Sequence, residues 1–349
     1  MAGASERVGR GVRALTPKTS NVMRKRYHEG YVTTDLPTGS ARITRRHRNL
    51  VVAAAVMTTL LVALGGIVCA TESGAGCPDW PGCYGRIVPP PQVNAVIEYT
   101  HRFAAGLTTP LILAAAWVSW RRARTIRWLI RPLLVAIPFL AAVIVFGAFA
   151  VLTGLPRLVA ALDLASALIT LTLVLTAAVV AYTRHVDPML PDRFSVSSLT
   201  RLSLATLGAT FVLYVSGILV AGKGSLTRCV GWPFWRLLPD DASGWPQMAR
   251  LGLAAVTALL IVWLVVRVLR THPLSAAQRL AATLAGLAFL LEMVVGVIML
   301  TSGSTMLLLM TYVAAGTVLF TALAVLATLF GLANEWHSQA GGITPSDQR

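Results

Sequence analysis

Charged residues are scarce in this sequence. Only 13% of its 349 residues are Asp, Glu, Lys or Arg, whereas 56% are hydrophobic and the mean hydropathy is +0.69. A soluble domain of this length needs more charge to cover its surface. The shortage therefore excludes an ordinary soluble protein and predicts that lipid surrounds most of the chain.

Long apolar stretches account for most of the sequence. Eight of them are roughly 20 residues long, which is the length that crosses the hydrocarbon core of a bilayer. The sequence therefore predicts an all-α, polytopic membrane protein with about eight transmembrane helices. The stretches lie near 50–71, 96–119, 129–150, 157–183, 200–221, 247–270, 277–301 and 305–331.

The net charge of +16 is not spread evenly along the chain. Arginines gather at every second boundary between apolar stretches, which is the positive-inside pattern of membrane proteins. A nucleic-acid-binding protein would instead carry a basic face on a folded soluble domain. The pattern predicts a multi-pass plasma-membrane protein with both termini in the cytoplasm and no nucleic-acid partner.

The apolar stretches divide the chain into four parts. Residues 1–48 are rich in Arg, Lys, Ser, Thr and Gly, and we expect a disordered cytoplasmic tail there. Residues 49–185 and 186–331 each contain four predicted helices, and 332–349 form a second cytoplasmic tail.

Cysteines are also few, and two of the four lie in a predicted outward loop at 72–95. Cys77 and Cys83 are separated by a Pro- and Gly-containing turn in an oxidising compartment, so we expect a disulfide between them. Zinc is the competing interpretation, but no third ligand lies nearby. The disulfide could be a simple loop staple or could have a functional role.

The other large outward loop, 222–246, resembles the first. Its Cys229 and Trp232 have the same spacing as Cys77 and Trp80, which predicts two pseudo-symmetric four-helix bundles descended from one unit. Cys229 and Cys69 have no obvious partners in the sequence. Whether they pair with each other stays open at this point.

Ionisable residues inside the apolar stretches are costly, so each is a candidate for function. Glu98 and His101 are three residues apart on one helical face, near the outer end of the second stretch. His101 could be a heme ligand, a proton relay or a strut between helices. We place the other five histidines in the tails or cytoplasmic loops. Arg102 could reach the outer interface or hold a carboxylate such as a heme propionate.

Three further charged residues fall inside apolar stretches. Asp163 lies in the fourth, and a buried carboxylate needs a proton or a partner. We expect Arg102 or His101 to be that partner. In the second half, Arg250 and Glu292 have opposite charges, and we expect an ion pair between their helices.

These motifs together resemble those of the heme A synthase family, whose members convert heme O to heme A with eight membrane helices. The resemblance rests on Cys77-Pro-Asp-Trp-Pro-Gly-Cys83, on Glu98-Tyr-Thr-His-Arg102 and on Gly154-Leu-Pro156, and it extends over about 49–331. It implies that heme O is the substrate and that His101 is an axial ligand of the heme iron. It also implies that Glu98 is the catalytic acid or base, next to Arg102.

The sequence departs from the family at three of its four heme-ligand positions. Asp163 stands in place of the second histidine, Arg250 in place of the third, and Thr311 or Tyr312 in place of the fourth. Asp163 could bind the iron as an oxygen ligand, or the iron could be five-coordinate. A heme b in the second half is not expected.

Three functions remain open. The first is a membrane oxidoreductase that oxidises a porphyrin methyl group of heme O for terminal oxidase biogenesis, with heme O synthase or oxidase assembly factors as partners besides heme and the bilayer. The second is a non-catalytic heme-binding or oxidase-assembly protein. The third is a small-molecule carrier, for which the repeated halves and buried charges are the only indications.

Overall fold

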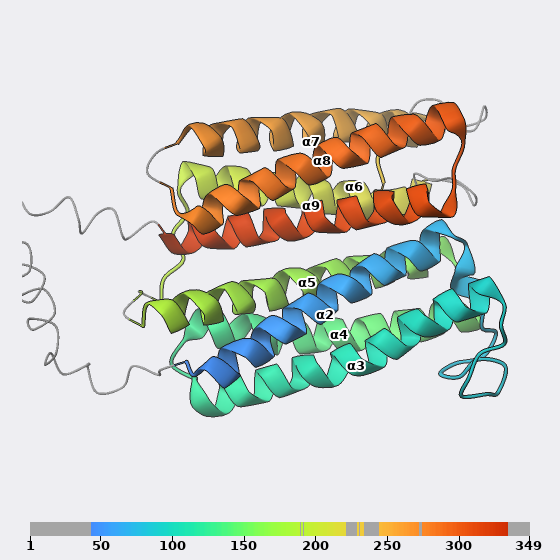
Figure 1. Cartoon of the computed structure of the whole chain (residues 1–349), viewed down its shortest axis with the longest axis horizontal. Coiled ribbons are helices and arrows are strands. Elements are labelled where there is room, and N and C mark those ends of the chain that lie inside the picture. Colours follow the sequence, from blue (N-terminus) through green and yellow to red (C-terminus); the bar gives the residue numbers. More distant parts are fainter. Residues whose placement is uncertain are drawn as a thin grey trace, which may run out of the picture. The chain divides into compact units, whose positions relative to one another are not determined.

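A computed structural model of the chain describes residues 43–188, 190, 192–220, 229, 231–233, 244–271 and 274–333. The predicted tail 1–48 therefore lies almost wholly outside the described residues, as does most of 332–349. Figure 1 labels the helices of the described part.

Eight long helices account for most of the described residues, and each is long and apolar enough to cross a membrane. This confirms the predicted all-α membrane fold, with each helix extending past at least one end of the apolar stretch that indicated it. A single short 3-10 turn, Ser73–Ala75, lies between the first two. The helices are α2 (Arg45–Ala70), α3 (Val93–Arg122), α4 (Arg127–Leu152), α5 (Arg157–Val186), α6 (Ser198–Val220), α7 (Trp245–Arg270), α8 (Ala276–Ser302) and α9 (Met306–Ala333).

Polar side chains define where several helices begin. The Thr44 side chain accepts the backbone N–H of His47, which starts α2 before the apolar stretch begins. Ser275 and Gln278 form a reciprocal capping box at the start of α8. Asp192 accepts backbone N–H groups from the first turn of α4, where the positive end of the helix dipole favours a carboxylate.

The helices pack as two sets of four. In the first set, α2 packs against α3 and α5, and α4 packs against the same two helices, so α3 and α5 are diagonal to each other. In the second set, α6 and α8 both pack against α7 and α9, which are diagonal in turn. Helices α2 and α5 meet α9, and α5 also meets α6 (Figure 1). Symmetry between the two sets stays a prediction.

The segment that joins the two sets is held against the end of α9. The Ser195 N–H donates to the carbonyl of Gly331, and the ring of Phe194 lies against the same glycine. A Cβ at position 331 would overlap that ring, so only glycine allows this close approach. Phe194 also stacks on Trp128 of α4, with ring centroids 4.7 Å apart.

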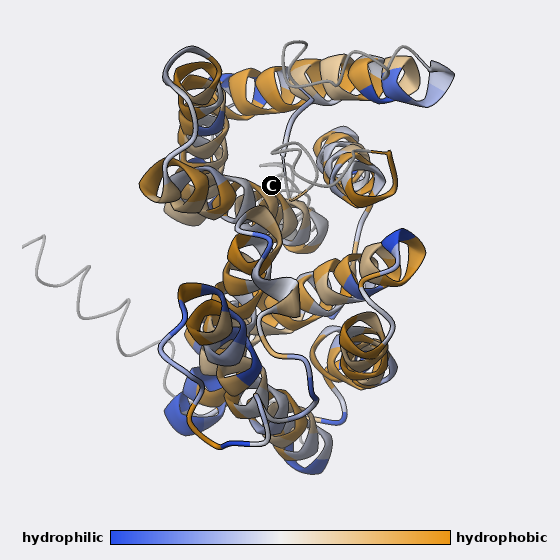
Figure 2. Cartoon of the chain, turned by 90° about the vertical axis from the view of Figure 1, so that its right-hand side faces the viewer, coloured by the Kyte–Doolittle hydropathy of each residue, from blue (hydrophilic) through white to orange (hydrophobic). Residues whose placement is uncertain are grey.

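Figure 2 shows hydrophobic residues along the helices and hydrophilic residues concentrated toward their ends and in the loops. Many of the large exposed side chains are aliphatic, such as Leu259 and Leu287, as expected where lipid replaces water. Between the helices lie small residues and hydroxyl-bearing residues, whose hydroxyls bond back to the helix backbone. Contact with lipid therefore explains the aliphatic side chains on the surface of the bundle, and close helix packing explains the small and hydroxyl-bearing side chains between the helices.

Candidate functional site

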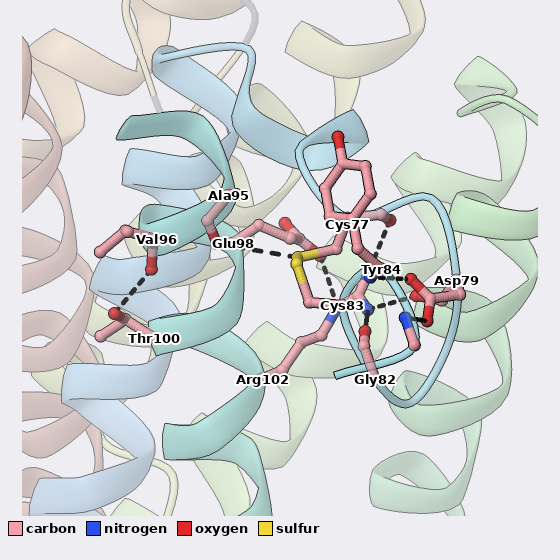
Figure 3. Close-up of a disulfide and its surroundings, with 11 residues drawn as sticks. Cys77, Asp79, Gly82, Cys83, Tyr84, Ala95, Val96, Glu98, Thr100 and Arg102 are labelled. Atoms are coloured by element: carbon pink, nitrogen blue, oxygen red, sulfur yellow. Dashed lines mark hydrogen bonds and ion pairs between the residues drawn. A yellow bond between two sulfur atoms is a disulfide. The ribbon is translucent and has the colours of Figure 1, made fainter. Parts of the chain in front are cut away.

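The loop between α2 and α3 is closed by a disulfide between Cys77 and Cys83, which confirms the predicted pair. The two Cα atoms are 4.7 Å apart and both cysteines are fully buried. They pack against Ala95 in the first turn of α3, with Tyr99 beside them. Figure 3 shows the disulfide beside the end of α3 from which Glu98 and Arg102 project. The loop is thus fixed directly above the residues that the sequence singled out.

Arg102 fastens this loop to the helix. Its guanidinium donates to the backbone carbonyls of Cys77, Asp79 and Gly82, and its Nε donates to a Glu98 carboxylate oxygen at 2.9 Å (Figure 3). The expected contact between Arg102 and a heme propionate stays a prediction. The Arg102 donors are engaged by the loop and by Glu98, because the disulfide directs three carbonyls toward the helix.

Asp79 stabilises the turn within the loop. Its carboxylate accepts the backbone N–H groups of Tyr84 and Gly85, the latter at 2.7 Å. These hydrogen bonds, the one from Gly85 above all, hold the pKa of the exposed Asp79 carboxyl below its ordinary value, and the nearby Arg102 adds to the effect. The loop therefore depends on a charged Asp79.

A second disulfide joins Cys69 to Cys229, with Cα atoms 5.7 Å apart. Cys69 ends α2 in the first set of helices, whereas Cys229 belongs to the loop after α6 in the second set. This answers the question that the sequence left open. The two sets are covalently connected at the end of the bundle that carries the Cys77–Cys83 loop.

Glu98 is buried, with 4% of its surface exposed, and its ion pair with Arg102 spans one turn of α3. The pairing neutralises a charge that would be costly inside the bundle. His101, on the same helix, is also largely enclosed, and its Nδ1 is buried without a hydrogen-bond partner among the described residues. The sequence prediction of an acid and an imidazole on one face is confirmed.

His101 lies against a glycine of the neighbouring helix. A Cβ placed on Gly65 of α2 would come within 3.1 Å of the imidazole Cε1, which is closer than ordinary packing. The glycine therefore makes room for the ring between α2 and α3. A strut between helices would place a polar partner there, and none is present among the described residues.

Asp163 faces the interior from α5, the helix diagonal to α3. Its Oδ1 is buried and has no hydrogen-bond partner among the described residues, so the expected pairing with Arg102 or His101 is wrong. It lies close enough to Glu98 for the two carboxyl groups to interact electrostatically. A Cβ on Gly147 of α4 would lie 3.8 Å from the Asp163 Oδ1. His101 and Asp163 thus each lie near a glycine of an adjacent helix, Gly65 of α2 and Gly147 of α4.

Comparison with known proteins gives this arrangement a family. The sequence model of the family described as cytochrome oxidase assembly protein matches residues 48–96 and 91–324. The chain belongs to the heme A synthase family of cytochrome oxidase assembly proteins. The match covers both sets of helices and begins at the start of α2.

Three relatives illustrate the similarity. The heme A synthase of Bacillus pumilus is 31% identical over 225 residues, which cover 60% of this chain and 71% of the relative. The heme A synthase of Staphylococcus haemolyticus is 26% identical over 250 residues, which cover 69% of this chain and 82% of the relative. The heme A synthase of Exiguobacterium sibiricum is 31% identical over 219 residues, which cover 60% of this chain and 72% of the relative. This similarity supports a shared fold, and each site residue must be judged on its own surroundings.

The first set of helices suits a heme, the group that the heme A synthase family implies. An imidazole with a buried, unpartnered nitrogen is a suitable axial ligand, and Gly65 leaves the ring free of a neighbouring side chain. Asp163 offers an unpartnered oxygen from the diagonal helix. Two unsatisfied groups that face inward from diagonal helices fit a ligand held between them, since buried polar atoms rarely lack partners without a reason.

The second set does not suit a heme in the same way. No histidine lies in its helices, and Trp232, from the segment between α6 and α7, is buried there against Phe289 of α8, with ring centroids 5.2 Å apart. The Trp232 backbone N–H donates to the Tyr312 hydroxyl at 2.7 Å, and Arg250 donates to the Gly231 carbonyl at 3.0 Å. Arg250 and Tyr312, which the resemblance placed at ligand positions, thus bind the loop.

The expected ion pair between Arg250 and Glu292 is wrong. Glu292 is fully buried, and neither of its carboxylate oxygens has a hydrogen-bond partner among the described residues, although Trp232 and Tyr214 lie close. Arg250 is drawn to the loop carbonyl instead, because the loop turns inward at Trp232. The sequence contained no signal for this inward turn beyond the repeated Cys and Trp spacing.

Two further histidines were misplaced by the sequence analysis. His47 lies in the first turn of α2, where it is buried and shares a 2.8 Å hydrogen bond with the Ser119 hydroxyl. His185 lies in the last turn of α5, with its Nδ1 2.8 Å from the Ile43 carbonyl. Both lie at the opposite end of the first set from His101, and both have partners. His101 therefore remains the histidine whose buried nitrogen has no partner among the described residues.

Proposed function

We propose that this chain is a membrane oxidoreductase of heme A biosynthesis that oxidises a methyl group of heme O to a formyl group, in support of terminal oxidase assembly. Family membership and the names of the relatives support a role in this pathway. The observation that carries the proposal is a pair of buried polar atoms without hydrogen-bond partners among the described residues: the His101 Nδ1 on α3, one turn from Glu98, and the Asp163 Oδ1 on the diagonal helix α5.

Each residue of the first set has a proposed role. His101 binds the iron of the substrate heme from α3, and Asp163 provides an oxygen ligand from α5 or leaves that position to a small molecule. Heme bound there presents the methyl group that is oxidised. Glu98, one helical turn from His101, takes up the proton that leaves during oxidation. Arg102 positions Glu98 through the 2.9 Å ion pair and holds the disulfide loop above it.

The second set is proposed to bind no heme. Arg250 and Tyr312 are engaged with the buried loop segment at Gly231 and Trp232, which supports this view. The chain would then hold one heme, in its first set, and electrons would leave by a route that does not use a second heme. The proposal also retains the plasma-membrane location, the cytoplasmic termini, and heme O synthase or an oxidase assembly factor as partner.

A spectrum and a product analysis test the proposal. The full-length protein, purified in detergent after expression with heme O synthase, is expected to contain one heme per chain and to yield hydroxylated and formyl products on extraction. His101→Ala should lose most of the heme. Glu98→Gln should keep the heme and lose the conversion, because the amide cannot accept the proton.

Glu292→Gln provides the matched control for Glu98→Gln. It changes a similarly buried carboxyl group in the second set and should leave both heme content and conversion unchanged. Colourless wild-type protein would refute heme binding altogether. Normal product yield from Glu98→Gln would remove Glu98 from the mechanism.

A non-catalytic heme-binding or assembly role is the second candidate. The loss of the family's ligands from the second set favours it, since oxidation requires an electron acceptor. The two candidates differ in one result. If the protein binds heme O through His101 but the extracted heme O is unmodified even when an electron acceptor is supplied, the chain is a non-catalytic heme-binding protein. A carrier would show no Soret band.

A further inference from the structure

The end of α3 opposite the disulfide loop carries two exposed tryptophans. Trp117 and Trp120 are 54% and 39% exposed, and their ring centroids are 5.3 Å apart. Tryptophan is favoured at the boundary between hydrocarbon and headgroups because its ring is apolar and its N–H is polar. The pair therefore marks the depth at which α3 leaves the hydrocarbon.

Two arginines stack on these rings. The guanidinium carbon of Arg121 lies 4.5 Å from the ring centroid of Trp117 and 5.8 Å from that of Trp120. Arg124 lies 4.4 Å from the Trp120 centroid, and its Nε donates to the Trp120 carbonyl at 2.7 Å. The two guanidinium planes are therefore held in place by stacking, so less side-chain entropy is lost when they bind a ligand. We call Trp117, Trp120, Arg121 and Arg124 the Trp–Arg patch.

No carboxylate of the described residues forms an ion pair with the Trp–Arg patch. Among the described residues the two ion pairs are Arg102 with Glu98 and Arg184 with Asp192. Asp192, which lies at the same end of the bundle as the patch, also accepts two N–H groups from the first turn of α4. Arg121 and Arg124 are both exposed. The patch thus presents fixed positive charge where headgroups would lie.

Other arginine–aromatic pairs of the described part are looser. Arg48 lies 5.8 Å from the Tyr182 centroid and Arg267 lies 6.0 Å from that of Trp263, each over a single ring. The positive-inside rule requires basic residues at these helix ends, but it does not require them to be stacked and close together. Orientation of the protein alone therefore leaves the geometry of the Trp–Arg patch unexplained.

We propose that the Trp–Arg patch is a binding site for the headgroup of an anionic phospholipid, in the leaflet predicted to face the cytoplasm. A phosphodiester matches the donor geometry of a guanidinium, and two of them held side by side can share one headgroup. The tryptophan rings occupy the depth of the glycerol region. Charge complementarity, and the lack of an ion pair between these arginines and any carboxylate in the part of the chain that the structure describes, favour lipid over a second protein as the occupant.

Native mass spectrometry of the full-length protein tests this. The protein is equilibrated in detergent with equal amounts of phosphatidylglycerol and phosphatidylcholine of the same acyl chains, and the lipid retained on each chain is measured. The wild-type protein is expected to retain one phosphatidylglycerol molecule per chain in preference to phosphatidylcholine. Arg121→Gln/Arg124→Gln should bind it roughly 30-fold more weakly, since each basic residue near an anionic surface contributes roughly fivefold and two residues are removed.

Arg201→Gln/Arg270→Gln is the matched control. It removes the same charge from two exposed arginines at the same end of the bundle, for which the structure shows no aromatic stacking. It should retain the lipid as wild type does, and equal loss in both double variants would overturn the proposal in favour of a net-charge effect. Inorganic phosphate at millimolar concentration should not displace the lipid; displacement would show a phosphate site instead.

Two conservative variants keep the test informative if the glutamine pair lowers stability. Arg121→Lys/Arg124→Lys preserves the charge but loses the planar stacking, so it should bind phosphatidylglycerol more weakly than wild type. Trp117→Leu/Trp120→Leu keeps both arginines and an apolar surface but removes the rings, and it should show a similar loss. Wild-type retention in both variants would refute the stacked site.

Discussion

Replacement of Arg102 by glutamine would break the connection between the disulfide loop and α3. The side chain loses an ion pair with Glu98 and hydrogen bonds to three loop carbonyls. Both partners of the ion pair are nearly enclosed, with 11% and 6% of their side chains exposed. Removal of one partner from such a pair typically costs about 3 to 5 kcal/mol, because the other charge is left buried.

Amide hydrogen exchange of the loop measures this loss where it occurs. In wild type the N–H groups of Tyr84 and Gly85 are protected by Asp79. If opening the loop becomes easier by about 3 kcal/mol, these amides should exchange roughly 100-fold faster in Arg102→Gln. Amides at the core of α5 should keep their rates, since Arg102 does not reach that helix.

A double variant separates the two roles of Arg102. In Glu98→Gln/Arg102→Gln no buried charge is left, so the double variant should be more stable than the sum of the single changes predicts, by about 1 to 3 kcal/mol. In Arg102→Lys the loop amides should exchange at a rate between those of wild type and Arg102→Gln, because an ammonium group cannot reach all the acceptors that the guanidinium group binds. Loop exchange in Arg102→Gln at the wild-type rate would refute the argument that Arg102 holds the loop.

Three further predictions follow from single contacts. Gly65→Leu should remove heme from the purified protein, measured by pyridine hemochrome, because its side chain would occupy the space of the His101 ring; Gly106→Leu, in open space on α3, should not. Cys69→Ser should lower the free energy of unfolding by up to about 5 kcal/mol in the chain-entropy estimate, and wild-type thermal stability of that variant would contradict it. The lowered pKa of Asp79 means that its charge stabilises the loop above the ordinary value of 3.8 and that this contribution is lost as the pH falls below it; Asp79→Asn should speed loop exchange at neutral pH and remove the acid dependence.

The sequence predicted the parts of the fold that depend on hydropathy. Eight apolar stretches gave eight helices, and the Cys77–Cys83 pair followed from a short turn between two cysteines in an oxidising compartment. Helix ends were less well predicted. The Thr44 cap starts α2 at Arg45, four residues before the predicted end of the tail region at 48/49. His47, which we expected in the tail, therefore lies in a helix.

Partners of individual side chains could not be read from the sequence. Arg102 was expected to reach outward or toward a ligand, yet three loop carbonyls converge on it because the disulfide bends the backbone toward α3. Arg250 and Glu292 were expected to pair because their charges are opposite. The inward turn of the loop at Trp232 instead offers Arg250 a carbonyl acceptor, and such loop geometry has no hydropathy signal.

The Cys69–Cys229 bond imposes an order on biogenesis. Cys69, Cys77 and Cys83 all emerge once α2 and α3 have been inserted, whereas Cys229 follows only after α6. The earliest thiol must therefore wait, unpaired beside two potential wrong partners, until three more segments have crossed the bilayer. Rapid closure of the local disulfide, whose two cysteines are six positions apart, would remove both wrong partners and so protect Cys69 from mispairing until Cys229 arrives.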